Sequence, residues 1–149
     1  MSMFCFQCQE TAKGTGCVVK GVCGKTDDVA QAQDLLVWVA KGISILGTIA
    51  RENRYSNAKV DRFVQEALFT TITNANFDKA RIYERINEGI ALREKFIVEM
   101  KGHGITIPWE TCTQAQHGNR QVSRILSKWL KRLDVLTTAS TRMYVHCVN

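Results

Sequence analysis

The sequence predicts an all-α protein in which an N-terminal cysteine-rich loop is followed by an antiparallel three-helix bundle. Three segments after residue 25 carry apolar residues at the three- and four-residue spacing of a helix face. Four cysteines and four glycines crowd the first 25 residues, and the next glycine is Gly42. No stretch alternates apolar and polar residues in the manner of a half-buried strand. Helices of this kind with short connections favour an antiparallel bundle.

The composition indicates one domain with its own core and no export signal. The chain has 149 residues, of which 45% are hydrophobic, which is enough to bury a core. No run of about 18 apolar residues is present, so we expect no membrane-spanning helix. The N-terminus lacks a charged segment followed by an apolar one, so we expect no signal peptide and a cytoplasmic location. Six cysteines in such a chain favour reduced thiols and bound metal over disulfides.

Three helices are expected between residues 26 and 108. The first opens at Thr26, a residue suited to capping, with acids in the first turn. The second starts near Asn57, and the third follows Asp78 and ends at Gly102 and Gly104.

The apolar positions of these helices predict which faces are buried. They are Leu35, Leu36, Val39, Ile43, Leu46 and Ile49 in the first helix, with Trp38 beside them; Val60, Phe63, Val64, Ala67 and Leu68 in the second; and Ile82, Ile86, Ile90, Phe96 and Ile97 in the third. The opposite face of the third helix is expected to be solvated and carries Lys79, Glu84, Glu88 and Lys95.

The four cysteines of residues 1–25 are the densest set of soft metal ligands in the sequence. They follow the spacing C-x2-C-x8-C-x5-C and are Cys5, Cys8, Cys17 and Cys23. Four thiolates on one short loop suit a metal ion or an iron–sulfur cluster, and glycines let the backbone wrap closely around such a group. Zinc sites usually pair two C-x2-C units, and only one is present. The uneven spacing favours a cluster, with zinc or non-ligand cysteines as alternatives.

The remaining cysteines and the histidines predict no second site. Cys112 and Cys147 stand alone, and a lone cysteine is more often a small apolar residue than a ligand. His103, His117 and His146 have no ligand spacing, and His103 is expected in an exposed loop. The sequence has no serine–histidine–aspartate arrangement and no phosphate-binding loop between a strand and a helix.

The residues around the cysteines resemble a known family. The similarity lies in the runs MFCFQCQETAKGTGC, GVCGKTDDVAQAQDLL, FTTITNANFD and IALRE, and it covers roughly residues 3–108. These runs resemble the hybrid cluster proteins, also called prismane proteins or hydroxylamine reductases. The resemblance implies that Cys5, Cys8, Cys17 and Cys23 hold a [4Fe–4S] cluster, as in the class with this cysteine spacing. It also implies reduction of hydroxylamine or nitric oxide with electrons from a donor protein.

The chain departs from that family in its length. A complete member is several times longer, and its later domains supply the ligands of the hybrid [4Fe–2O–2S] cluster where substrate is reduced. We therefore expect an N-terminal fragment, residues 1–25 and 26–108, that holds the cluster where electrons enter, has no catalytic residue and is inactive alone. Without those domains the third helix is expected to expose an apolar face. The alternatives are a stand-alone iron–sulfur electron carrier and a zinc-stabilised binding module.

Residues 109–149 are expected to be a basic tail outside the family. From residue 117 onward six basic residues stand against one acid, whereas residues 1–116 carry 14 basic and 13 acidic residues. Apolar and basic residues between 122 and 133 suit an amphipathic helix on a membrane or an acidic partner. We favour a shift of reading frame between about Pro108 and Ala115. Permitted codons for residues 139–149, read from the third base, encode INEDVRSLRE, which resembles the family. We therefore expect no nucleic-acid or membrane partner.

Overall fold

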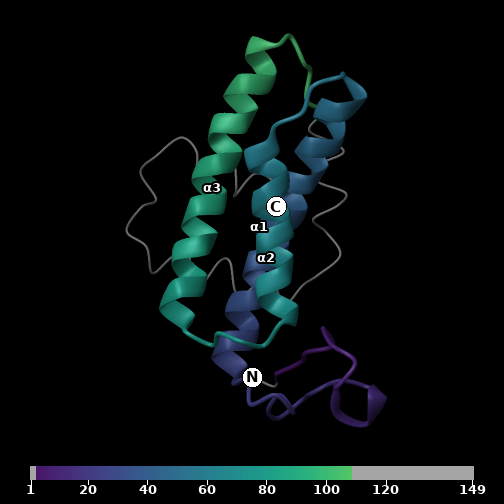
Figure 1. The fold of residues 1–149 in the computed structure, drawn as a ribbon, viewed down its shortest axis with the longest axis vertical. Helices are drawn as coiled ribbons and strands as arrows, with labels where there is room; N and C mark the ends of the chain where they lie inside the picture. The colour runs from purple at the N-terminus through teal and green to yellow at the C-terminus, as the bar shows by residue number, and fades with distance from the viewer. Residues whose placement is uncertain (1–2, 109–149) are drawn as a thin grey trace.

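The computed structural model describes residues 3–108, which form three α-helices after a short 3-10 turn. The turn η1 spans Ala12–Gly14, and the helices are α1 (Asp27–Glu52), α2 (Ala58–Ile72) and α3 (Lys79–Gly102). Figure 1 shows the helices side by side, with the chain reversing direction at each connection. Within residues 3–108 the extended pairing is one isolated bridge between Cys5 and Cys17. The prediction of an all-α fold is confirmed.

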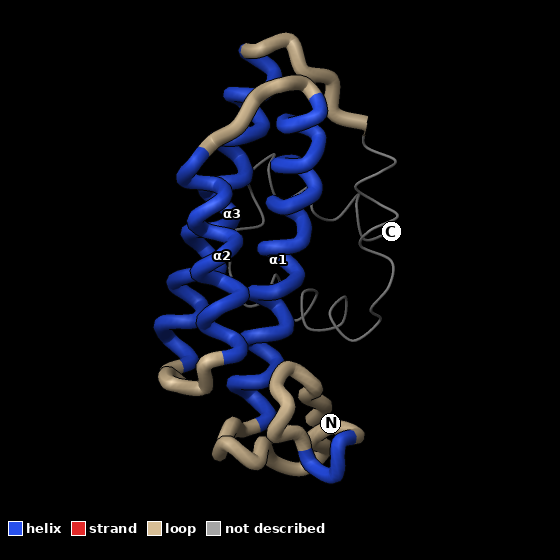
Figure 2. Tube along the Cα trace, turned by 45° about the vertical axis from the view of Figure 1, so that its right-hand side comes forward, coloured by secondary structure: helices blue, strands red, loops and turns tan. Residues whose placement is uncertain are grey.

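The cysteine loop lies at one end of this arrangement. Figure 2 shows it folded beside the beginning of α1, at the same end as the loop that joins α2 to α3. The loop packs in a small core in which Met3 and Cys17 are buried against Ala30 of α1. The larger core lies between the three helices and is a separate cluster. The loop therefore depends on the helices for its position, while the helices have their own packing.

The helices begin where the sequence predicts, but their caps differ. Asn57 accepts bonds from the Lys59 and Val60 amides at 3.0 and 3.4 Å, and Asp78 accepts one from Ala80 at 2.9 Å. These bonds satisfy N–H groups that the first turn of a helix leaves unpaired. Thr26 also takes the predicted cap position, with Asp27 and Asp28 in the first turn as expected, but it lacks the side-chain capping bond.

The Thr26 hydroxyl is engaged by a nearby carboxylate instead. It donates to Asp28 Oδ1 at 2.6 Å. That bond and the Lys79 ammonium, whose Nζ lies 3.2 Å from Asp28 Oδ2, hold the pKa of Asp28 below its usual value. Both residues are exposed, so these contacts add little to the stability of the fold.

Removal of the α2 cap is expected to destabilise the protein more than removal of the Thr26 hydroxyl. Asn57→Ala should lower the free energy of unfolding by about 1–2 kcal/mol, because it leaves two helix amides without their acceptor. Thr26→Ala is the matched control and should change it by less than about 0.5 kcal/mol. Urea unfolding followed by circular dichroism measures both. Equal losses would contradict the assignment of the caps.

The core contains almost all of the apolar positions that the sequence predicts. Those positions are buried or half-buried, with the exception of Leu68, which is 44% exposed. Leu68 lies near the end of α2, where Phe69 and Ile72 are also exposed. On α3 the predicted solvated face is exposed as expected, and Val98 is the one large apolar side chain that the described part of the helix exposes. The expected exposed apolar face of α3 is therefore reduced to Val98. The other exposed apolar side chains lie at the end of α2 and on the cysteine loop.

Gly89 marks the point where α3 comes closest to the other helices. It is buried in the middle of α3. A Cβ built at this position would lie 2.5 Å from Phe63 Cζ and 2.9 Å from Val39 Cγ1, one from each neighbouring helix. No Cβ fits at such distances unless the neighbours shift. The glycine is therefore required for the close packing of all three helices.

By length and composition alone, α1 is long and apolar enough to cross a membrane. In the structure 56% of its most apolar window is buried by the rest of the protein. The central helix of a three-helix core meets the same criterion, because it is contacted from more than one side.

Candidate metal centre

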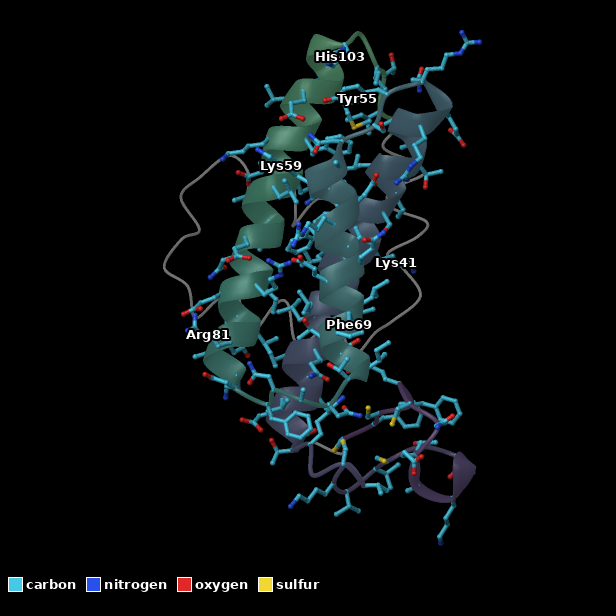
Figure 3. All side chains as sticks on the ribbon, in the orientation of Figure 1. Lys41, Tyr55, Lys59, Phe69, Arg81 and His103 are labelled. Atoms are coloured by element: carbon cyan, nitrogen blue, oxygen red, sulfur yellow. The ribbon has the colours of Figure 1, made fainter. Side chains whose placement is uncertain are left out.

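The four cysteines lie on the loop beside the beginning of α1. Cys17 is 5% exposed, Cys5 and Cys8 are half-buried, and Cys23 is exposed. All four are free thiols. Figure 3 shows sulfur atoms in this loop, at the end of the molecule opposite His103. In residues 3–108 no three cysteine, histidine or acidic side chains come close enough together to hold a metal ion. The structure therefore brings the cysteines to one loop without closing them into a ring of ligands.

The backbone holds two of the cysteines directly opposite each other. Cys5 and Cys17 exchange both main-chain hydrogen bonds, with N···O distances of 3.0 and 2.9 Å. This is the hydrogen-bonded pair of an antiparallel ladder. The Thr11 hydroxyl adds a bond to the Cys5 carbonyl at 3.2 Å. The first and third cysteines of the motif are thus fixed relative to each other by the chain itself.

Two of the loop glycines lie where a side chain would not fit. A Cβ at Gly16, whose φ is +131°, would stand 2.6 Å from the Phe4 ring. A Cβ at Gly21 would stand 3.0 Å from Cys23 Sγ and 2.9 Å from Lys25 Cβ. A Cβ at the other two loop glycines, Gly14 and Gly24, would have nothing within 4 Å, and close approach of the glycine backbone to a metal group stays a prediction. At Gly21 the approaching group is a cysteine sulfur, so this glycine shapes the site itself.

Cys17 receives the clearest hydrogen bonding of the four sulfurs. The Ala12 amide donates to its Sγ at 3.4 Å, and the Thr11 hydroxyl lies 3.7 Å from it. The Ala12 and then the Val22 backbone N–H groups hold the pKa of Cys17 below its usual value, while burial opposes this effect. N–H groups directed at sulfur stabilise the thiolate, which is the form that binds metals. The Cys17 environment therefore suits a metal-bound thiolate.

Lys25 is a site residue that sequence reasoning did not single out. It is 1% exposed, and its Nζ donates to Cys5 Sγ at 3.7 Å and to the Thr71 carbonyl at 3.4 Å. Burial raises the pKa of Asp34 to about 6, and the Lys25 ammonium acts against that rise. The sequence signal that could have identified Lys25 was its position, two residues after Cys23 and two residues before the start of α1.

The other residues considered from the sequence lie away from the loop or outside the described residues. His103 is exposed at the end of α3 and lies against Tyr55, with ring centroids 4.2 Å apart and ring planes tilted by 31°. Figure 3 shows both side chains at the far end of the helices. The prediction of an exposed His103 is confirmed. Cys112, Cys147, His117 and His146 lie outside the described residues.

Comparison with known proteins shows a family and several similar enzymes. The model of the Prismane/CO dehydrogenase family matches residues 3–144. A hydroxylamine reductase of Desulfitobacterium hafniense (strain DSM 10664 / DCB-2) is 58% identical over 108 residues, which is 72% of this chain and 20% of that protein. The hydroxylamine reductase of Thermoanaerobacter pseudethanolicus is 54% identical over 112 residues, 75% of this chain and 20% of its own. The hydroxylamine reductase of Bacteroides fragilis (strain YCH46) is 58% identical over 94 residues, which is 63% of this chain and 17% of that protein. The chain spans about a fifth of the length of these relatives.

Proposed function

Because the chain belongs to the Prismane/CO dehydrogenase family, we propose that residues 3–108 form the N-terminal iron–sulfur part of a hydroxylamine reductase. The family implies an iron–sulfur cofactor, and the cysteine loop is the part of the described structure with the ligands for one. The observation that carries the proposal is the 58% identity to a hydroxylamine reductase over 72% of the chain. The hydrogen bonding of the loop sulfurs supports it.

In this proposal the ligands of a [4Fe–4S] cluster are Cys5, Cys8, Cys17 and Cys23. Such a cluster accepts one electron and passes it on. The residues around it position the sulfurs: the ladder pair fixes Cys5 against Cys17, and the Ala12 amide lowers the pKa of the Cys17 thiol, which favours the thiolate. The three helices would serve as an antiparallel bundle that supports this cluster-binding loop.

The proposed role is that of a fragment, because the chain spans about a fifth of its relatives. We propose that electrons arrive from a donor protein in the cytoplasm, without a membrane or nucleic-acid partner, and that the hybrid cluster belongs to the missing part. Exposed apolar side chains support this view. They lie on the loop and at the end of α2 and are Phe4, Phe6, Val18, Val19, Val22, Leu68, Phe69 and Ile72. Large exposed apolar surface commonly marks a contact with further protein.

Anaerobic reconstitution of the full 149-residue chain tests the metal content. With iron, sulfide and zinc all supplied, we expect roughly four iron and four sulfide atoms per chain and little zinc, because four thiolates at this spacing suit a cubane cluster. Metal and sulfide analysis measures this. Zinc without iron would support a zinc-stabilised module instead, and two iron atoms per chain would contradict the four-iron assignment.

The same preparation tests the fragment role. We expect no hydroxylamine reduction with dithionite-reduced viologen as the electron source, because the hybrid cluster is proposed to belong to the part of the relatives that this chain does not span. Substantial turnover would contradict this part of the proposal. For residues 109–149, which lie outside the described residues, we propose a shift of reading frame: the family model reaches residue 144, but the 58% identity to the relative covers 108 residues. A gene sequence that does not continue the family in another frame would refute it.

A further inference from the structure

Lys25 carries a buried charge that the proposed function does not yet use. Its side chain is 1% exposed, in a protein whose other lysines in the described cysteine loop, Lys13 and Lys20, are exposed. Removing an ammonium from water costs several kcal/mol unless acceptors compensate for the lost hydration. The identity of its acceptors therefore shows what holds this charge in place.

The acceptors of the Lys25 ammonium come from two separate parts of the chain. Thr71, whose carbonyl accepts one bond at 3.4 Å, lies in the last turn of α2. Carbonyls in that turn have no partner within their own helix, and the negative end of the helix dipole attracts a cation. The other acceptor is Cys5 Sγ, at 3.7 Å. Lys25 thus connects a cysteine sulfur of the loop to the end of α2.

A neutral thiol is a weak partner for a buried ammonium, whereas a thiolate is a strong one. Burial raises the pKa of Asp34 to about 6 against the effect of the Lys25 charge, and a carboxyl with that pKa is still mostly ionised at neutral pH. When Cys5 binds a metal its sulfur is a thiolate. A metal-bound Cys5 would therefore give Lys25 a charged acceptor within hydrogen-bond reach, in addition to the Asp34 charge.

We propose that Lys25 is a positioning residue that holds the Cys5 sulfur in place and raises the reduction potential of the cluster bound there. The inference rests on the proposed function. Reduction adds one electron from an external reductant, converts one ferric iron equivalent to ferrous, and changes no bond of Lys25. The reduced state carries one more negative charge, so a nearby ammonium stabilises it more than the oxidised state. Burial of the ammonium limits screening by salt.

The test compares three variants of the full reconstituted chain by redox titration with dithionite, followed by absorbance and electron paramagnetic resonance. Lys25→Met removes the charge and keeps the length of the side chain. Lys25→Arg keeps the positive charge, although the planar guanidinium group differs in shape from the lysine ammonium. Lys20→Met is the matched control, because it removes the same charge from an exposed position on the same loop.

We expect Lys25→Met to lower the equilibrium constant for reduction at least tenfold, which is a decrease of ~59 mV for a one-electron couple. Lys25→Arg should restore most of the difference, and Lys20→Met should stay close to the parent. If Lys25→Met binds less iron, recovery of the iron by Lys25→Arg supports the positioning role, and failure of Lys25→Arg to recover it refutes that role.

Two results would overturn the inference alone. One is a Lys25→Met cluster at the parent potential, and the other is an equal shift in Lys20→Met, which would show a general effect of net charge. A parent chain that takes up no iron would overturn the proposed function and this inference together. The reduction potential of the cluster distinguishes an electrostatic role of Lys25 from a purely structural one. Loosening the loop does not by itself stabilise the oxidised cluster over the reduced cluster, whereas loss of the ammonium charge does.

Discussion

Replacing Cys17 by serine is expected to lower the iron affinity of the chain by more than roughly tenfold, the smallest effect usually seen when only an outer partner of a metal ligand is lost. Cys17 is the most buried of the four cysteines and the one whose sulfur receives the Ala12 amide. A serine hydroxyl is a poor ligand for iron in place of a thiolate. Iron content per chain after anaerobic reconstitution measures the effect.

The control for Cys17→Ser is Cys112→Ser, which removes a cysteine that the sequence analysis leaves out of the ligand set. Cys112→Ser should keep the parent iron content. The helical circular dichroism of both variants should match the parent, because the helices have a core separate from the small cluster around Cys17. Equal iron content in Cys17→Ser and the parent, with intact helices, would remove Cys17 from the ligand set.

The same substitution at two helix glycines should have opposite effects on stability. Gly89→Ala is expected to lower the free energy of unfolding by about 1–3 kcal/mol, because the new Cβ forces Phe63 and Val39 apart in a packed core. Gly42→Ala, in the middle of α1, meets no atom within 4 Å. It should raise the free energy of unfolding by about 0.5–1 kcal/mol, since alanine favours a helix over glycine.

Urea unfolding of the metal-free chain, with circular dichroism at a helical wavelength, measures both glycine variants under one condition. The sign difference is informative because both substitutions add the same methyl group to a helix interior. A stabilising Gly89→Ala would show that α3 does not pack against α1 and α2 as closely as the structure has it. An unchanged slope against urea would show that the surface exposed on unfolding is the same in both variants, so that the midpoints report stability.

The helices could be predicted from the sequence because their signals are local. Asn57 and Asp78 mark two helix starts, and the glycines near residue 102 mark the last helix end, within one or two residues of their observed positions. The apolar spacing also predicted the buried faces. It failed at Leu68, because a helix pattern does not show where the neighbouring helix stops covering that face. The burial of Leu68 depends on tertiary contacts that lie far away in the sequence.

The site was harder to predict than the helices. Spacing and composition pointed to the four cysteines, but the partners of the sulfurs are not local in the same way. Lys25 lies 46 residues from Thr71, and no motif joins the two. Thr26 shows the reverse problem, since a residue suited to capping is drawn away by a carboxylate two positions on. Competition between acceptors is decided by geometry, which residue type alone does not specify.

The partners of the cysteine loop described above reach no further along the chain than Thr71. During synthesis, at roughly 5–20 residues per second, these partners exist roughly two to six seconds before the last residue of α3 is added. The contacts within the loop span even shorter distances in sequence. In the order of synthesis, every partner of the loop described above therefore precedes the third helix.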